Sequence, residues 1–323
     1  MQRLHYHLLD VFTREPFGGN QLAVFTDAAS IAPELMPRIA RELNLSETVF
    51  VLPPAGLAVA RLRIFTPGAE LPFAGHPTVG TACLLASTGV IDTAGGMASI
   101  IFEEGVGDVH VRVHAAAGDS PSWAQLTAAQ PPELRATELT SAPLASLLGV
   151  AESDIGADAS RSPGPAAVSC GVPFLFIPVR SGDALARCRL NVGAWESHLA
   201  QTWAPHVFVY TTATRGRTAA RAGTAGDEAS IGAGRAQIRG RMFAPAMGIP
   251  EDPATGAAAT ALAGLLAHHA GTDGTHRWTL SQGTEMGRPS SLELEAEVSQ
   301  GVVTACRVGG HAVIVGRGEL LLR

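Results

Sequence analysis

Short runs of β-branched, aromatic and leucine residues recur along the chain and predict a protein rich in strands. The clearest run is "DVHVRVH" at 108–114, where apolar and polar residues alternate strictly, as on a strand with one buried face. Similar runs predict strands at 5–12, 21–25, 47–52, 60–65, 98–102, 171–179, 206–212 and 237–245. Longer stretches predict helices at 32–44, 77–90, 141–149, 184–200 and 253–269.

Two loop-like stretches divide these elements into an earlier and a later set. Residues 116–123 and 153–166 are rich in glycine, proline, serine and aspartate, and the strand pattern starts again after them. A chain of 323 residues also exceeds the size at which one core keeps growing. We therefore expect an α+β protein of two similar domains, 1–125 and 126–323, each with strands around one long helix. The extreme C-terminal strand can return to the first domain.

A short motif occurs in both sets and indicates an internal repeat. Its copies are "RIFTP" (63–67) followed by "GHPTVGTAC" (75–83), and "RMFAP" (241–245) followed by "EDPATGAAA" (251–259). In this register, which needs a two-residue gap, Gly80 matches Gly256. His76 and Asp252 then fall on the same position. The repeat predicts duplicated domains that face each other across a cleft.

In both copies a proline follows the polar residue, and we expect Pro77 and Pro253 to open helices, because proline is tolerated at the first helical position. Asp252 would then be the N-cap, with His76 in the equivalent place. Capping alone accounts for Asp252, whereas histidine is a poor cap and calls for another reason. Two helix starts with free N–H groups, pointing into one cleft, would bind a small carboxylate or a developing enolate.

A candidate base for such chemistry is Glu47 in "NLSETVFV" (44–51), where a predicted helix ends and a strand begins. A glutamate usually faces solvent. If Glu47 instead faces the cleft, partial burial would raise its pKa towards neutrality, which suits a base that removes a proton from carbon.

Composition narrows the classes of function. The net charge of −6 gives no attraction to nucleic acid or to anionic lipid, and the one basic cluster, Arg215, Arg217 and Arg221, lies in a Gly/Ala/Thr-rich stretch that predicts a solvated loop. All 23 basic residues are arginine, which excludes a pyridoxal-phosphate enzyme and a P-loop, since both need a lysine. The Met1 end, "MQRLHYHLLDVF", has neither the apolar stretch nor the cleavage site of a signal peptide, so we expect none. No apolar run is long enough for a membrane span, and the four cysteines are scattered. We expect reduced thiols in a cytoplasmic protein.

Six segments together resemble the phenazine-biosynthesis PhzF family, which has the diaminopimelate-epimerase-like fold. They span nearly the whole chain in the family's order: "DVFTREPFGGNQLAVF" (10–25), "NLSETVFVLPP" (44–54), "RIFTPGAELPFAGHPTVGTA" (63–82), "GVPFLFIPV" (171–179), "FAPAMGIPEDPATGAAA" (243–259) and "QGTEMGRPS" (282–290). The resemblance implies two pseudo-symmetric α+β domains, each a mixed or antiparallel barrel-like sheet around a central helix. It also implies a homodimer without cofactor or metal.

The resemblance further implies an isomerase that relocates a proton on a small carboxylic acid, as in the conversion of trans-2,3-dihydro-3-hydroxyanthranilate to its ketone. On this basis Glu47 is the acid and base, supported by His76 and Asp252. The substrate would be bound by four further residues: Ser46, Gly75, Gly256 and Asn20. A single proton carried by one carboxyl group requires a closed, dry site, because water would otherwise exchange it.

Two positions depart from the family pattern. Ala257 stands where serine is common, which removes one hydroxyl donor to a bound anion and costs about 1.5–3 kcal/mol for a hydrogen bond to a charged group. Gln21 stands where proline is usual. The first departure points to a different acid group or a different substrate.

Two alternatives to the isomerase stay open. A one-base racemase or epimerase of the same fold would also use Glu47, whereas a cysteine-based epimerase is disfavoured because Cys83 lies inside its predicted helix. A non-catalytic protein that binds small acids is the other alternative. Histidine pairs such as His5 with His7 lack a third ligand at sensible spacing, and we expect them to face solvent rather than hold a metal. Arg288, in "GRPS" (287–290), could point into the cleft, although the turn needs no ligand to explain it.

Overall fold

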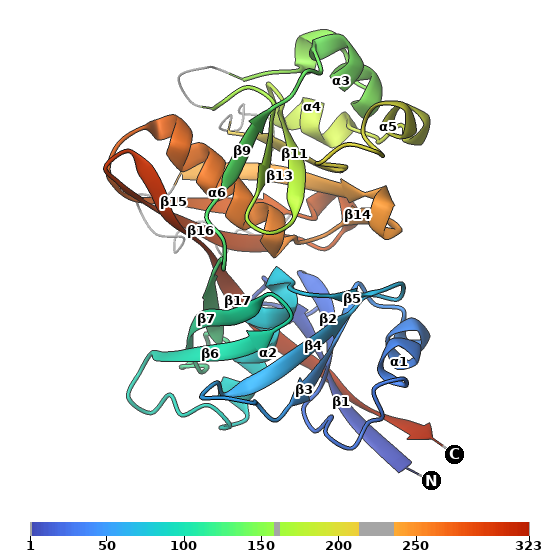
Figure 1. The fold of residues 1–323 in the computed structure, drawn as a ribbon, viewed down its shortest axis with the longest axis vertical. Coiled ribbons are helices and arrows are strands. Elements are labelled where there is room, and N and C mark those ends of the chain that lie inside the picture. The colour runs from blue at the N-terminus through green and yellow to red at the C-terminus, as the bar shows by residue number, and fades with distance from the viewer. Residues whose placement is uncertain (1, 158–161, 213–235, 323) are drawn as a thin grey trace.

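The computed structural model describes residues 2–157, 162–212 and 236–322, and the fold is of the α+β class. The arginine cluster at 215–221 lies outside the described residues. Figure 1 shows the elements in two groups, one around helix α2 (Gly75–Ser87) and one around helix α6 (Gly256–Ala270). Each group is a curved sheet with its helix against the inner face.

The first sheet closes on itself. Eight strands form a continuous ring of hydrogen-bonded neighbours, in the order β1–β2–β3–β4–β6–β7–β8–β17 and back to β1. Their bounds are Gln2–Val11, Asn20–Phe25, Glu47–Leu52, Ala60–Phe65, Ala98–Glu104, Gly107–His114, Trp123–Thr127 and Val302–Leu322. The two-residue strand β5 (Glu70–Leu71) pairs with the end of β4.

Helix α2 is enclosed by this ring. Every residue from Gly75 to Ala86 is buried, and the helix contacts β1, β2, β3, β7, β8 and β17. Its sequence is small and apolar on all sides, which is what a fully enclosed helix requires.

The second sheet also has eight hydrogen-bonded strands, but no pairing between described residues closes it. The strand order is β9–β10–β11–β12–β13–β15–β16–β17. The bounds of the first seven are Glu133–Ala136, Ala166–Ser169, Pro173–Pro178, His206–Thr211, Ala236–Ala244, Gly274–Gln282 and Ser290–Ser299, and β14 (Ile249–Asp252) pairs with β13. Helix α6 packs against β16 and β17 and is buried from Ala258 to Ala267.

Strand β17 belongs to both sheets. Its first part pairs with β16, its middle with β8, and its last part, Ala312 to Leu322, with β1 (Figure 1). The register places Gln2 opposite Leu322, so the two ends of the described chain are hydrogen-bonded neighbours.

The remaining helices lie outside the sheets. They are α1 (Met36–Leu43), α3 (Ser141–Leu148), α4 (Gly182–Arg187) and α5 (Val192–His198), with 3₁₀ turns at Glu152–Asp154, Pro245–Met247 and Thr284–Met286. The prediction of one helix at 184–200 is wrong, because two helices with separate caps occupy that stretch. The side chain of Ser181 caps α4 and that of Asn191 caps α5.

One local arrangement occurs in both sheets. Arg63 on β4 forms a two-point ion pair with Glu70, and its guanidinium lies 5.0 Å from the ring centre of Phe65. Arg241 on β13 pairs in the same way with Glu251, 5.1 Å from the ring of Phe243. In each case the glutamate lies five positions before the first residue of the central helix, Gly75 or Gly256.

This arrangement corrects the register of the internal repeat. The sequences match without a gap as "ELPFAG" (70–75) and "EDPATG" (251–256), five residues away from the expected alignment. Asp252 therefore corresponds to Leu71, and His76 corresponds to Ala257. The expectation that His76 and Asp252 occupy equivalent positions is wrong.

Candidate active site

The starts of the two central helices meet backbone to backbone. A Cβ atom added to Gly75 would lie 2.6 Å from Gly256 Cα, and one added to Gly256 would lie 2.7 Å from Gly75 Cα. Any side chain at either position would collide with main chain, so glycine is required at both. Neither helix has a side-chain cap, which leaves first-turn N–H groups of both helices at this junction.

The expected caps are wrong. Helix α2 begins at Gly75 with Ala74 as N-cap, so Pro77 is the third helical residue rather than the first. Helix α6 begins at Gly256 with Thr255 as N-cap, and Asp252 is the last residue of β14. The prolines that precede the helices in the true register are Pro72 and Pro253, which lie in the turns before the helix starts.

Glu47 does not face solvent, although that is the usual place of a glutamate. It begins β3, is only 9% exposed, and its Oε2 atom lies 3.3 Å from Nε2 of His76, which is 3% exposed. Neither atom has another partner among the described residues. Buried polar atoms are nearly always paired, so an acid and an imidazole left with only each other are a candidate for chemistry.

Asp252 is held firmly, in contrast to Glu47. Its Oδ1 accepts a hydrogen bond from Nδ2 of Asn20 at 2.9 Å, and its Oδ2 accepts one from the hydroxyl of Thr255 at 2.5 Å. Gln282 completes the network: its amide N–H groups donate to the Asp252 carbonyl at 2.8 Å and to the Thr255 hydroxyl at 3.1 Å. The Thr255 N–H donates in turn to Gln282 Oε1 at 3.2 Å.

Asn20 connects Asp252 to His76, and its hydrogen bonds determine the tautomer of His76. Its Nδ2 lies 2.9 Å from Asp252 Oδ1, 3.0 Å from the carbonyl of Ala254 and 3.3 Å from Nδ1 of His76. The two oxygens take both amide hydrogens, so none is left for the imidazole. His76 therefore carries its proton on Nδ1 and presents Nε2 as an acceptor to Glu47.

Burial sets the protonation of all three groups. It raises the pKa of Glu47 well above its usual value, and the nearby charge of Asp252 raises it further. It lowers the pKa of His76 to about 3, against the effect of a hydrogen bond to the backbone of Gln21. It raises the pKa of Asp252 to about 6, where the hydrogen bonds from Thr255 and Asn20 hold it back. At neutral pH His76 is therefore neutral and Asp252 is ionised, while Glu47 holds a proton more tightly than an ordinary glutamate.

The structure brings six of the seven candidate residues together. Asn20 contacts His76 and Asp252, and His76 contacts Glu47. Gly75, the residue before His76, meets Gly256. Ser46 directly precedes Glu47, is half-buried, and has no hydrogen bond to another described side chain or backbone group. Ala257 follows Gly256 in the first turn of α6, so a serine there would sit at the helix junction.

Thr255, Gln282 and Arg288 are supporting residues whose roles the sequence did not reveal. Arg288 does not point at Glu47; its guanidinium binds Asp10 Oδ1 at 2.6 Å and the carbonyls of Gly18 and Gly19. These glycines directly precede Asn20. A clue was present for all three, because they lie in the segments that carry the family resemblance, but their side-chain contacts join distant parts of the chain.

Within 2–157, 162–212 and 236–322, no cluster of three or more histidine, cysteine, aspartate or glutamate side chains could hold a metal ion. In the same ranges, no helix has the length and apolar character needed to cross a bilayer. All four cysteines are free and buried, including Cys83 within α2.

Solved structures with the same fold define the class of protein. A PhzF-family protein from Bacillus anthracis superposes with a TM-score of 0.82 at 23% identity and covers all of both chains. A predicted epimerase from Pseudomonas aeruginosa gives a TM-score of 0.73 at 31% identity, covering 99% of this chain and all of the other. A probable proline racemase from Agrobacterium radiobacter, 10% identical with a TM-score of 0.58, covers 99% of this chain and 93% of its own and shows the wider fold alone.

The sequence relatives narrow the class to one family. The family model described as phenazine biosynthesis-like protein matches residues 9–318. An uncharacterized isomerase from Mesorhizobium japonicum is 40% identical over the full length of both chains. The trans-2,3-dihydro-3-hydroxyanthranilate isomerase of Pseudomonas chlororaphis is 35% identical over 98% of this chain and 99% of its own. The chain belongs to the PhzC-PhzF family, as its sequence resemblance indicated, and is an isomerase.

Proposed function

We propose that this isomerase moves a proton between carbon atoms of a small carboxylic acid without a cofactor, with Glu47 as the acid and base. The observation that carries the proposal is the buried 3.3 Å contact between Glu47 Oε2 and His76 Nε2, two atoms that no other described group satisfies. The substrate class is that of the relatives named for trans-2,3-dihydro-3-hydroxyanthranilate.

The transfer uses one carboxyl group in two roles. Ionised Glu47 removes a proton from an acidic C–H bond, and the electron pair of that bond enters the conjugated system of the substrate. The protonated carboxyl then delivers the same proton to another carbon, which shifts the double bond and restores the carboxylate. A raised pKa suits both steps, because it strengthens the base and makes it hold the proton long enough to return it.

His76 and Asp252 orient the substrate on either side of Glu47. Neutral His76 offers Nε2 as an acceptor for a hydroxyl or amino hydrogen of the substrate. Asp252, whose orientation Asn20 and Thr255 fix, attracts an amino substituent. Burial excludes water from the proton while Glu47 carries it.

The substrate carboxylate is held at the junction of Gly75 and Gly256. First-turn N–H groups and the positive ends of two helices favour a negative charge there, and the absence of side chains leaves the backbone exposed to a ligand. The hydroxyl of Ser46, next to Glu47, is a further donor.

We also infer that the two groups of elements are domains related by duplication, 1–125 and 126–323, with the last part of β17 returning to the first domain and the active-site cleft between them. The support is the repeated set of Arg63, Phe65 and Glu70 in one group and Arg241, Phe243 and Glu251 in the other. The homodimer and the cytoplasmic location remain predictions; size-exclusion chromatography with light scattering tests the first.

The decisive experiment mixes the protein with trans-2,3-dihydro-3-hydroxyanthranilate and follows the substrate by absorbance, and the fate of the migrating hydrogen by NMR in D₂O. Conversion that is lost in Glu47→Gln, while that variant still binds the substrate, supports the proposal. Binding by the wild type without conversion would instead identify a non-catalytic acid-binding protein. Exchange at one carbon without a double-bond shift would identify a racemase.

A further inference from the structure

The repeat pairs a buried glutamate in the first sheet with a buried glutamine in the second. Strand β4 runs parallel to β6 with Arg61 opposite Glu103, and β13 runs parallel to β15 with Arg239 opposite Ser281. Arg61 and Arg239 each lie two residues before the arginine of the repeated set. The next residue along β6 and β15 is therefore Glu104 in one sheet and Gln282 in the other.

Gln282 shows what this position does. It is 1% exposed, ends β15, and its neutral amide binds the N-cap residue Thr255 through both the backbone N–H and the hydroxyl. It thereby holds the start of helix α6 in place beside Asp252. A neutral group is required, because the amide both donates and accepts.

Glu104 stands in the equivalent place at the start of α2. It is 8% exposed and ends β6, and its Oε1 atom lies 2.6 Å from the hydroxyl oxygen of Thr78. The same hydroxyl oxygen lies 2.8 Å from the carbonyl oxygen of Ala74, the N-cap residue of α2. Gln282 reaches its N-cap residue directly, and Glu104 reaches its own through Thr78.

The number of hydrogens decides the state of Glu104. The Thr78 hydroxyl has one hydrogen and can donate either to Ala74 or to Glu104, but not to both. Both contacts are hydrogen bonds only if Glu104 is protonated, so that its O–H donates to Thr78 and Thr78 donates to Ala74. Burial agrees with this state, since it raises the pKa of Glu104 to about 8.

We propose that Glu104 is a positioning residue that acts as a neutral acid, the counterpart of Gln282, and holds the helix start that carries Gly75 and His76. Its ionisation would turn the Thr78 hydroxyl away from Ala74 and loosen that start. The consequence for catalysis rests on the proposed role of His76.

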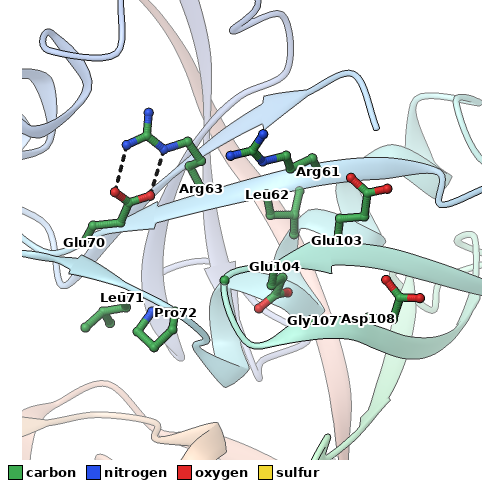
Figure 2. A pocket seen from close by; sticks show the side chains of 11 residues that line it. Arg61, Leu62, Arg63, Glu70, Leu71, Pro72, Glu103, Glu104, Gly107 and Asp108 are labelled. Carbon is green, nitrogen blue, oxygen red and sulfur yellow. Dashed lines mark hydrogen bonds and ion pairs between the residues drawn. The ribbon is translucent and has the colours of Figure 1, made fainter. Parts of the chain in front are cut away.

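Glu104 also lines a cavity of about 600 Å³ between β4, β5 and the β6–β7 turn, so its proton can be exchanged from outside the active site (Figure 2). The charged groups that line the same cavity are Arg61 and Arg63 from β4, Glu70 from β5, Glu103 from β6 and Asp108 from β7. Arg63 is engaged by Glu70, and Glu103 by the backbone N–H groups of Ala55 and Gly56. Helix α2 places the hydroxyl of Thr78 beside Glu104 but no charged group.

The test compares Glu104→Gln with Glu104→Leu, and Thr78→Ser with Thr78→Val. Amide hydrogen exchange at 75–80 measures the helix start without any substrate. We expect Glu104→Leu and Thr78→Val to lower kcat about 10- to 100-fold, since a small misplacement of a catalytic group has effects of this size, with little change in KM. Glu104→Gln and Thr78→Ser should retain wild-type exchange and turnover. The double variant Glu104→Leu/Thr78→Val should be no worse than either single one, because both break one chain of contacts.

A pH series separates a neutral acid from a carboxylate. Once the intrinsic base-catalysed rise in exchange is divided out, protection of the helix start should fall in the wild type above about pH 8 and stay constant in Glu104→Gln. The folded protein keeps this proton where the unfolded chain has lost it, so wild-type stability should fall relative to Glu104→Gln between about pH 5 and pH 8.

Equal losses of turnover and of exchange protection in Glu104→Gln and Glu104→Leu would overturn the proposal. Wild-type turnover and exchange in Glu104→Leu would also overturn it. If Glu104→Leu does not fold, Thr78→Val carries the same comparison. If the wild type converts no substrate, the proposed function fails for that compound, whereas the exchange measurements still decide the role of Glu104.

Discussion

The two central helices begin in the same way and are used differently. At the start of α6, Asp252, Thr255 and Gln282 form a network in which each side chain has its partners. At the start of α2, Glu47 Oε2 and His76 Nε2 have only each other. The two helix starts thus differ: the side chains at α6 are held by hydrogen bonds, whereas Glu47 and His76 at α2 keep unpartnered atoms, and in the proposed function the first set orients the ligand and the second reacts with it. The substitutions below test this division, in order of decreasing effect.

Glu47→Gln should have the largest effect. It keeps the shape and the buried position but cannot accept a proton from carbon, so kcat should fall about 10²- to 10⁴-fold. Substrate affinity, measured by calorimetry, should change little. Glu42→Gln, an exposed glutamate on α1, is the matched control and should leave turnover unchanged. Full activity in Glu47→Gln would move the reaction to another group.

Asp252→Asn should lower kcat about 10- to 100-fold, the rate equivalent of about 1.5–3 kcal/mol for a hydrogen bond with a charged partner. It also removes the negative charge that raises the pKa of Glu47. The acid limb of kcat/KM reports ionisation of the base, so it should move to lower pH in this variant. An unmoved limb would show that the two carboxyl groups do not interact.

Gly75→Ala should destabilise the junction of the helices by about 1–3 kcal/mol, the usual cost of overpacking a tight site. The added Cβ would meet the backbone of Gly256, which no side-chain rotation can relieve. Gly95→Ala is the control, because a Cβ there meets nothing within 4 Å. Denaturant unfolding of both variants measures the difference, and equal stability would contradict the close approach.

Substitution of two threonines should give the smallest effects on stability, and the two variants should differ clearly from each other. Thr255→Val removes a donor to Asp252 and an acceptor for Gln282, which should cost about 1–2 kcal/mol of stability. Thr48→Val, beside Glu47, removes a buried hydroxyl that already has no partner and should be neutral within about 0.5 kcal/mol. Thermal unfolding measures both. A large cost at Thr48, which lies on the opposite face of β3 from Glu47, would mean that its hydroxyl has a partner.

Much of the fold could be predicted because its strands carry local patterns. The ranges 47–52 and 60–65 agree with β3 and β4 to the residue, and the alternation at 108–114 marks β7. The helix starts could not be placed in this way. Proline at the first helical position is a local rule, whereas the need for Gly75 and Gly256 comes from a contact between helices about 180 residues apart.

The same limit applies to the candidate site, where residues with a local sequence signal were predicted and one without such a signal was missed. Glu47, His76 and Asp252 were singled out by their places at predicted element ends, and the family resemblance then assigned their roles. The structure brings them close together, while their roles in catalysis stay predictions. Glu104 was missed because the predicted strand stopped at residue 102, and a glutamate beyond a strand end normally faces water. Its contact with Thr78 in the folded structure is what distinguishes Glu104 from such a solvent-facing glutamate.

The long strand β17 has a consequence for how the protein is made. The first barrel needs residues 307–322 to bridge β8 and β1, so it cannot close until nearly the whole chain has left the ribosome. During translation β1 and β8 present open edges, and helix α2 has no complete enclosure. Folding of the amino-terminal half is therefore completed after synthesis, and removal of the last ten residues should leave residues 2–6 of β1 without a partner strand, while residues 7–11 still pair with β2.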